Sequence, residues 1–413
     1  MANYRDPLTY HSSSPAGKIG TCITKPLESL ADLAVAYTPG VASPCSTIAA
    51  MPSKVYDYTG KGNLVGMITN GTSVLGLGNI GALAAKPVME GKAMLMKKLA
   101  GIDCFDLEIN EQNPQTLAKM IEAVSPTFGA INLEDIKAPE CFEVERILIE
   151  RLNIPVVHDD QHGTAITTAA ALVNALFLAK KSLDKINIVM YGAGAGGIAT
   201  AKLLLAMGAK KSKMVMFDSK GLLDTSRKEL PVHKVPFVTK RKVASLDEAM
   251  EGADVFLGFS VGDVLKPVHL TKMAESPIIF AMANPRPEID PLLARRQRPE
   301  VIMGTGGANY PNQINHTLVF PYLFRGLLDV RATRLTEGIK LALVEALAAL
   351  GRGEGEEAYT FDAKHLLPNA LDRRLLTTLT PAVAKKAMEE GIAQRPIKNW
   401  TDYMEKLKGV GPG

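Results

Sequence analysis

The sequence predicts an α/β fold: a Rossmann-like, doubly wound parallel-sheet domain, preceded by an N-terminal mixed α/β domain and followed by C-terminal helices. Two apolar segments, 186–191 and 214–218, are predicted strands on either side of a glycine-rich turn and a helix. Two further apolar segments, 255–259 and 278–282, end in polar or glycine residues, and a helical part follows from near Asn315. Strands of this kind indicate a parallel sheet with its site at the strand carboxyl ends.

The chain is expected to divide into three parts. Residues 1–157 combine segments punctuated by proline and glycine with an apolar run, LVGMI, and a helix-like stretch, KPVMEGKAMLMKKLAG, which indicates a mixed domain. Residues 158–330 contain a nearly all-apolar helix at 163–181, expected to be buried between layers, and then the Rossmann-like units. Residues 331–413 are predicted to be helical and to pack back on the other domains, with a flexible, charged loop at 351–357.

Composition indicates an ordinary globular protein. The 413 residues are 46% hydrophobic and 22% charged with a net charge of +4, which gives no electrostatic argument for nucleic-acid binding. The four cysteines form no CxxC pair, which is typical of reduced thiols. The N-terminus has no apolar signal-peptide core, and the longest apolar stretch, 165–179, is short for a membrane span. We therefore expect a cytoplasmic protein without nucleic-acid or membrane partners.

A glycine-rich fingerprint predicts a dinucleotide site. It fits GxGxxG between a strand and a helix, where glycines let the backbone approach a pyrophosphate at the helix start; its glycines are Gly192, Gly194 and Gly197. Asp218 ends the next strand, where an acidic group can bind the adenosine ribose. A second match at 76–81 is followed by no strand ending in an acid, and we interpret it as a backbone turn near the substrate.

Two adjacent carboxylate pairs precede this fingerprint. Glu134 and Asp135 follow the apolar run INL, and Asp159 and Asp160 follow IPVVH. Carboxylates in an apolar setting repel one another and lose hydration, so a divalent cation or a cationic side chain is needed to keep them ionised. Either pair could instead cap a helix, because Asp is a favoured N-cap. Two pairs, each after an apolar run, favour a hard metal ion beside a redox cofactor.

Tyr37 in YTPGVA and Lys92 in VMEGKA are candidates for proton transfer, although a packing tyrosine and a surface lysine are the alternatives. A lysine near a cationic metal has its pKa lowered and can act as a base, while a tyrosine can donate a proton. His158 and His162 flank the second carboxylate pair without helical zinc spacing, and we interpret them as solvated or hydrogen-bonded. The cluster at 304–315 is either a pocket wall or a surface loop.

Taken together, these motifs resemble the malic enzymes, which oxidise and decarboxylate malate to pyruvate using NAD or NADP with magnesium or manganese. The match covers nearly the whole chain through YTPGVA, NGTSVLGLGNIG, KPVMEGKA, NLEDI, HDDQHGTA, YGAGAGG, MANPRPEI and NQIN, and it is closest to the bacterial NADP-dependent branch. Large members of that branch carry an additional C-terminal acyltransferase-like domain. This chain is too short to hold it, and regulation attached to that domain is expected to be missing.

The resemblance implies a role for each motif residue and makes the N-terminal part the substrate and metal domain. The metal would be bound by Glu134, Asp135 and Asp160. The proton relay would use Lys92 paired with Asp159, with Tyr37 as the acid. Asn284 and Asn315 would bind the substrate carboxylates, and the dinucleotide would contact Gly192, Gly194, Gly197 and Asp218. The chain departs from the family at two positions. His316 stands where a second Asn is frequent, and Ser73 where the animal branch has a substrate-binding Arg. The family also makes a homodimer or a higher homo-oligomer the expected assembly.

Two features bear on the choice of cofactor. Asp218 alone would favour NAD by accepting a ribose hydroxyl and repelling a 2′-phosphate. Ser219 can donate to a 2′-phosphate and Lys220 adds positive charge, so the sequence favours NADP over NAD. The alternatives to a malic enzyme are a metal-dependent hydroxyacid dehydrogenase with another substrate and a non-catalytic dinucleotide-binding sensor.

Overall fold

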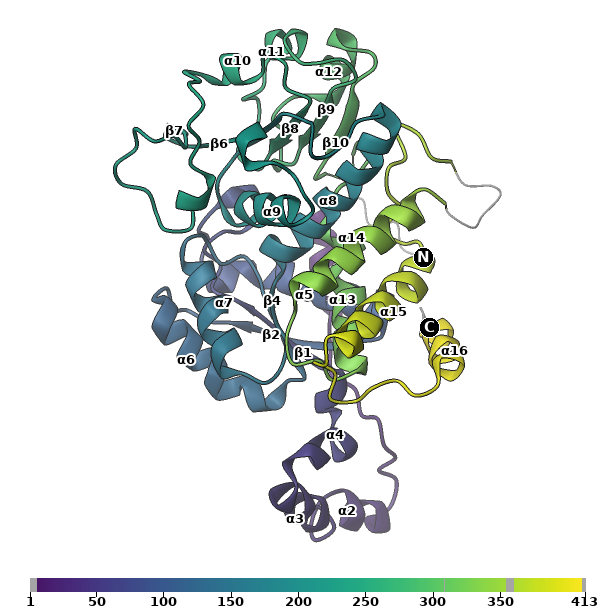
Figure 1. Ribbon diagram of the computed structural model, residues 1–413. Helices are drawn as coiled ribbons and strands as arrows, with labels where there is room; N and C mark the ends of the chain where they lie inside the picture. The colour runs from purple at the N-terminus through teal and green to yellow at the C-terminus, as the bar shows by residue number, and fades with distance from the viewer. Residues whose placement is uncertain (1–5, 308, 354–359, 411–413) are drawn as a thin grey trace.

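The computed structural model describes residues 6–307, 309–353 and 360–410. Within these residues the chain forms a four-stranded sheet and a six-stranded sheet, and helices cover both (Figure 1). The long helix α8 (Asp159–Ala179) directly follows the last strand of the first sheet and leads to the second sheet. The predicted α/β fold is confirmed.

The first sheet is parallel throughout and has the order β2-β1-β3-β4. Its strands are β1 (Leu64–Thr69), β2 (Asp103–Glu108), β3 (Ala130–Leu133) and β4 (Val156–His158), and its helices are α5 (Ala82–Ala100), α6 (Pro114–Val124) and α7 (Glu140–Arg151). The register between β3 and β4 matters for function. Leu133 pairs with His158, so the residues that follow them, Glu134 and Asp159, leave the sheet side by side.

The second sheet has the order β10-β9-β8-β5-β6-β7 and is parallel except for the short edge strand β7. Its strands are β5 (Ile188–Tyr191), β6 (Met214–Asp218), β7 (Gly221–Leu222), β8 (Val255–Gly258), β9 (Ile278–Ala281) and β10 (Ile302–Thr305), with helices α9 (Ala195–Ala206), α10 (Leu246–Ala249), α11 (Pro267–Thr271) and α12 (Pro291–Gln297). The predicted strands at 186–191, 214–218, 255–259 and 278–282 are all present to within two residues.

Helix α8 lies in the core, as predicted. It contacts α9 and also α14, one of the C-terminal helices. Those helices are α13 (Phe320–Asp329), α14 (Glu337–Gly351), α15 (Arg374–Glu389) and α16 (Trp400–Gly409). The expectation that this apolar segment is too short to span a membrane was wrong, because α8 begins at Asp159 and has the length and composition of a membrane span. However, 67% of its most apolar part is buried inside the protein, as in a core helix. The predicted loop at 351–357 begins as α14 ends, and residues 354–357 lie outside the described residues.

The helices before the first sheet contribute little to its core. They are α1 (Pro7–Ser12), α2 (Leu30–Ala36), α3 (Ala42–Ala50) and α4 (Val55–Tyr58), and none of their described residues is buried. Residues 27–58, here called the N-terminal arm, hold α2, α3 and α4, and Figure 1 shows α2 and α3 well away from both sheets. Several large apolar side chains of the arm are exposed: Leu27, Leu30, Leu33, Val35, Tyr37, Val41, Met51 and Tyr58.

Short 3-10 turns complete the described elements. They are η1 (Pro52–Lys54), η2 (Gly60–Asn63), η3 (Leu75–Leu77), η4 (Ser125–Thr127), η5 (Lys211–Lys213), η6 (Val235–Phe237) and η7 (His316–Leu318). Two of them, η3 and η7, border the site described next.

Candidate active site

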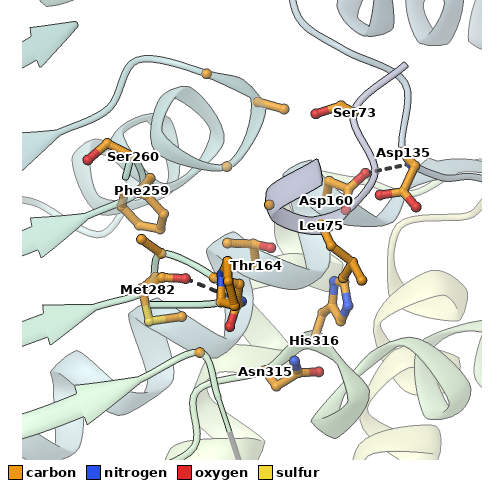
Figure 2. Close-up of a pocket in the computed structure, with 18 of the residues that line it drawn as sticks. Ser73, Leu75, Asp135, Asp160, Thr164, Phe259, Ser260, Met282, Asn315 and His316 are labelled. Atoms are coloured by element: carbon orange, nitrogen blue, oxygen red, sulfur yellow. Dashed lines mark hydrogen bonds between the residues drawn. The ribbon is translucent and has the colours of Figure 1, made fainter. Parts of the chain in front are cut away.

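A cavity of about 790 Å³ lies where the carboxyl ends of the two sheets face each other. Figure 2 shows Asp135 and Asp160 on one side, with Phe259, Ser260 and Met282 on the other. The wall therefore combines the carboxylates after the first sheet with the strand ends of the second.

Three carboxylates on one wall are spaced as ligands for a cation. Single oxygen atoms of Glu134, Asp135 and Asp160 all lie within 4.8 Å of one another. The Asp135 N–H donates to Asp160 Oδ2 over 2.8 Å, and Asn132 Nδ2 donates to Glu134 Oε2 over 2.9 Å. The buried Asp135 Oδ2 has no hydrogen-bond partner among the described residues. This donor set of hard oxygens suits magnesium or manganese.

The backbone holds this wall in a strained conformation. Asp135 has a φ of 53°, in the left-handed region that costs a non-glycine residue about 1 kcal/mol or more. Its carbonyl oxygen accepts the N–H groups of Thr72 (3.1 Å) and Ser73 (2.9 Å), so the loop after β1 fixes it. Strain of this kind is typical of functional sites, where the surrounding structure supports it.

Burial and mutual repulsion disfavour the ionised form of these carboxylates. Burial, and then the Asp160 charge, raise the pKa of Glu134 to about 7. Burial, Asp160 and Glu134 raise the pKa of Asp135 to about 9, and burial also raises the pKa of Asp160. A divalent cation would remove this repulsion, so the residues present fit a metal ion.

Lys92, a buried residue on α5, lies next to these carboxylates. Its Nζ contacts Glu134, lies 2.7 Å from Asp159 Oδ2, and stands 5.0 Å from the centre of the Phe320 ring. Burial by itself would lower its pKa, but the Asp159 and Glu134 carboxylates outweigh burial and raise it above the ordinary value. The lowered Lys92 pKa was predicted beside a bound cation; without a cation, the anions around the ammonium group raise that pKa.

Two amide side chains and a histidine line the cavity near these groups. Asn315 Oδ1 caps η7 by accepting the N–H of Thr317 over 2.9 Å, while its Nδ2 donates no hydrogen bond to another described residue. Asn284 lies opposite, after β9, and is exposed to the cavity. His316 Nδ1 lies 3.3 Å from Asp159 Oδ2. The structure thus brings both predicted substrate residues to the same cavity.

Neither of the two histidines beside Asp159 and Asp160 is among the described residues that line the cavity. His162 Nε2 lies 2.8 Å from Glu145 Oε1, which confirms the interpretation of a hydrogen-bonded side chain. His158 is fully buried, and neither ring nitrogen has a hydrogen-bond partner among the described residues. Burial would raise the pKa of Glu145, but the charges of His162 and His158 and the hydrogen bonds from both residues together outweigh burial and lower that pKa to about 2.

The glycine-rich turn has the geometry that its pattern predicts. Gly192 has a φ of 117°, and a Cβ there would lie 2.4 Å from the Phe259 carbonyl oxygen. A Cβ on Gly197 would lie 2.0 Å from the Gly192 carbonyl oxygen. Gly194 is the N-cap of α9 and lines the cavity with the first turn of the helix. No side chain caps that turn, so its N–H groups can face a pyrophosphate.

Asp218 is held by two cations. Arg227 binds it in a bidentate ion pair, with Nη1 2.8 Å from Oδ1 and Nη2 3.1 Å from Oδ2, and Lys234 Nζ lies 2.8 Å from Oδ2. Burial would raise the pKa of Asp218, but these two partners bring it well below its usual range. Ser219 and Lys220 follow as exposed residues. Neither contact could be anticipated from the sequence, because Arg227 and Lys234 lie in an irregular segment that carries no periodic signal.

The remaining glycine clusters also border the cavity. Gly76 and Gly78 line it, and a Cβ on Gly76 would lie 2.3 Å from the Asn284 carbonyl oxygen, which confirms a backbone turn beside the site. For the cluster at 304–315, Gly306 and Ile314 line the cavity, so the pocket wall is the correct alternative. Ala308 lies outside the described residues.

Tyr37 is not brought to the cavity by its own chain. It is the C-cap of α2 on the N-terminal arm, and 67% of its surface is exposed. It is absent from the residues that line the cavity in the described part of the chain.

Comparison with known proteins agrees with this geometry. The family profile "Malic enzyme, N-terminal domain" matches residues 16–121, and "Malic enzyme, NAD binding domain" matches residues 161–388. The NADP-dependent malic enzyme of Halomonas elongata is 48% identical over 398 residues, 94% of each chain. The NADP-dependent malic enzyme of Escherichia coli is 49% identical over 97% of this chain, which spans only 54% of that longer protein.

The fold agrees as well. A crystal structure of a malic enzyme from Pyrococcus horikoshii matches with a TM-score of 0.90 and 39% identity, covering 98% of this chain and 94% of that one. The two profiles leave residues 122–160 unmatched, which include β3, β4 and the carboxylates, but the Halomonas relative and this structure match 94% and 98% of the chain. The chain belongs to the malic enzyme family.

Proposed function

We propose that the protein catalyses the divalent-metal-dependent oxidative decarboxylation of (S)-malate to pyruvate and carbon dioxide, with reduction of NADP or, less well, NAD. One observation carries the proposal. A cation-binding carboxylate set, a buried Lys92–Asp159 pair and the start of a dinucleotide-binding helix lie around a single cavity. In this arrangement residues 1–157 supply most of the metal and proton-transfer groups, and residues 158–330 supply the cofactor site and the helix that carries Asp159 and Asp160.

Glu134, Asp135 and Asp160 would hold magnesium or manganese. A second possible set, Glu134 with Asp159 and His316, is partly filled because Lys92 Nζ already contacts Glu134 and Asp159. When bound, the ion would supply a Lewis acid that polarises the C2 oxygen of malate and stabilises negative charge there.

Lys92 is the proposed base. The hydroxyl proton of malate would move to Lys92 Nζ, and the bound dinucleotide would supply the hydride acceptor for C2, so that oxaloacetate would form. Lys92 must be neutral to accept it, and a cation held by Glu134 would favour that form by offsetting the carboxylates that raise the Lys92 pKa. Asp159, fully buried, orients the amine and stabilises the ammonium form.

Decarboxylation then breaks the C3–C4 bond. The C4 carboxylate leaves as carbon dioxide, and its bonding electrons form the C2–C3 double bond while the C2 carbonyl electrons pass to the C2 oxygen, giving the enolate of pyruvate. Tyr37 then donates a proton to C3, which gives pyruvate, and the proton that Lys92 took from the hydroxyl replaces the one lost from Tyr37. Asn315 Nδ2 and the Asn284 side chain are the proposed donors to the substrate carboxylates, because both face the cavity.

Tyr37 can take this role only from a second copy of the chain. It lies on an arm whose described helices bury none of their residues and expose many large apolar side chains. We therefore propose a homodimer in which the arm of one protomer covers the partner and carries Tyr37 to the partner's cavity. Packing of the arm against a partner would also remove its apolar surface from water.

The proposed preference for NADP rests on Asp218. Its two oxygens are already bound by Arg227 and Lys234, so a ribose hydroxyl would have to compete with two ion pairs. Two cations around one anion leave net positive charge beside Ser219 and Lys220, which suits a 2′-phosphate. Asp218 would thus anchor the cations instead of binding the ribose.

The proposed setting is the cytoplasm. All four cysteines, Cys22, Cys45, Cys104 and Cys141, are free thiols, as is usual in a reducing compartment.

A substrate panel tests the proposal. Purified protein with NADP and manganese should reduce the cofactor with (S)-malate and produce pyruvate, and a chelator should stop the reaction. Turnover of another 2-hydroxy acid in preference to malate would favour a different hydroxyacid dehydrogenase. Cofactor binding without turnover of any substrate would favour a sensor.

A further inference from the structure

A buried carboxylate outside the cavity binds the chain on both sides of Asp159 and Asp160. Glu145, on α7, is 7% exposed. Its Oε1 accepts the backbone N–H of His158 over 3.0 Å and lies 2.8 Å from His162 Nε2, and its Oε2 accepts Gln161 Nε2 over 3.1 Å. One side chain thus contacts the residue before the two aspartates and the two residues after them.

These contacts fix an abrupt turn. Strand β4 ends at His158 and α8 begins at Asp159, with no loop between them. His158 is the N-cap, and its own side chain makes no capping hydrogen bond. In a capping box the third residue of the helix accepts the N–H of the N-cap through its side chain. Here Glu145 accepts that N–H from the neighbouring helix, and Gln161, the third residue of α8, binds Glu145 instead.

The direction of this first turn decides what the two aspartates contact. Asp159 points to Lys92 Nζ, and Asp160 accepts the Asp135 N–H. Both aspartates are adjacent to residues that Glu145 holds. A rotation of the first turn would therefore move the relay carboxylate and the cation-binding carboxylate together.

Glu145 itself faces another part of the molecule. With Gln161 and His162 it lines a separate cavity of about 370 Å³ formed by α7, α8, α9 and α14, and it is not among the described residues that line the active-site cavity. It can act on substrate or metal only through α8.

We propose that Glu145 is a positioning residue that sets the first turn of α8 so that Asp159 and Asp160 meet their partners. The inference rests on the proposed metal role of Asp160. Residues that orient metal ligands from outside the ligand set typically contribute about 10- to 100-fold to metal affinity or activity, and the same range is expected for Glu145.

Manganese titration of the full chain tests this. Glu145→Gln keeps the side-chain volume but removes the negative charge and replaces one acceptor oxygen with a donor, so the contacts with His158 and His162 lose their charge assistance and the Gln161 amide must turn to keep its own. We expect its manganese dissociation constant to rise about 10- to 100-fold, with NADP affinity unchanged and kcat largely recovered at saturating manganese. The control is Glu150→Gln, on the same helix and lining the same second cavity, where an exposed carboxylate pairs with Arg146; it should bind manganese as the wild type does.

Hydrogen exchange on the metal-free protein gives a second readout. The His158 amide should be protected in the wild type and less protected in Glu145→Gln. If that variant does not fold, Gln161→Met removes one of the three donors and should weaken manganese binding by a smaller factor.

The outcomes separate the two proposals. Wild-type manganese affinity in a folded Glu145→Gln protein, or in Gln161→Met where the first variant does not fold, overturns the positioning role. Wild-type manganese affinity in Asp160→Asn would instead overturn the metal site. Loss of manganese binding in Asp160→Asn with no change in Glu145→Gln leaves the metal site standing and refutes only the role of Glu145.

Discussion

Replacing Lys92 with methionine should impair both catalysis and folding, and the two effects can be measured apart. The substitution removes the cation that contacts Glu134 and Asp159 while nearly preserving side-chain length. Asp159 is fully buried, and its Oδ1 has no partner among the described residues, so it would be left as a buried anion. Breaking a buried ion pair in this way costs about 3–5 kcal/mol of unfolding free energy.

The expected loss in catalytic rate, expressed as a free energy, is similar to the expected loss in unfolding free energy. Removing a general base lowers kcat about a hundred- to ten-thousandfold, which corresponds to about 3–5 kcal/mol in the activation barrier because each tenfold is about 1.4 kcal/mol. Urea unfolding gives the stability change, and NADPH absorbance gives kcat. The double variant Lys92→Met with Asp159→Asn should recover part of the stability, since the buried Asp159 charge is removed while Glu134 remains, but none of the rate. A folded Lys92→Met enzyme within a few-fold of wild-type kcat, or an active double variant, would refute Lys92 as the base.

Three further predictions concern the cofactor, the arm and pH. Arg227→Ala should raise KM for NADP more than for NAD, since it removes positive charge beside the proposed 2′-phosphate position; an equal change in both constants would contradict this. Tyr37→Phe and Lys92→Met proteins should each be nearly inactive, yet mixed and re-equilibrated protomers should regain activity, because one site then has both residues; no recovery in a demonstrated mixed dimer would contradict the role of a partner's tyrosine. The Glu145 carboxyl has a pKa lowered to about 2 from about 4.3 in unfolded chains, so its contribution, at most about 3 kcal/mol, is present above pH 4.3 and is lost as pH falls toward 2. The difference in unfolding free energy between wild type and Glu145→Gln should therefore shrink as pH falls from 5 toward 2, and a constant difference would show that the carboxylate charge is not responsible.

Four of the six strands of the second sheet could be predicted from the sequence because their signal is local. Each of the four is a continuous apolar run, and the glycine-rich turn between β5 and α9 has a fixed spacing. The two-residue β7 and the strand β10, which ends in Gly304 and Thr305, were not predicted. In contrast, several residues of β2 are exposed or only partly buried, and β4 is only three residues long, so neither strand gave a clear hydrophobic pattern. Helix α8 was expected to begin at residue 163, but it begins at Asp159 because the polar first turn is held by tertiary contacts that periodicity does not show.

The carboxylate cluster could be anticipated in kind but not in geometry. Two pairs of acids after apolar runs pointed to a cation, yet only the pairing of Leu133 with His158 shows why Glu134 and Asp159 become neighbours. The ion pairs of Asp218 and the contacts of Glu145 join residues on different elements or irregular turns, and a single sequence has no signal for them. In the proposed homodimer, the position of Tyr37 relative to a cavity depends on a second copy of the chain, for which a single sequence has no signal.

The most direct test of the proposed reaction follows the C4 carboxyl group of malate. Protein incubated with (S)-malate labelled at C4, NADP and manganese should release labelled carbon dioxide, pyruvate and NADPH in equal amounts, and none of them after chelation of the metal. NADPH formed with accumulating oxaloacetate and no labelled carbon dioxide, or NADPH formed equally well without any divalent metal, would contradict the account.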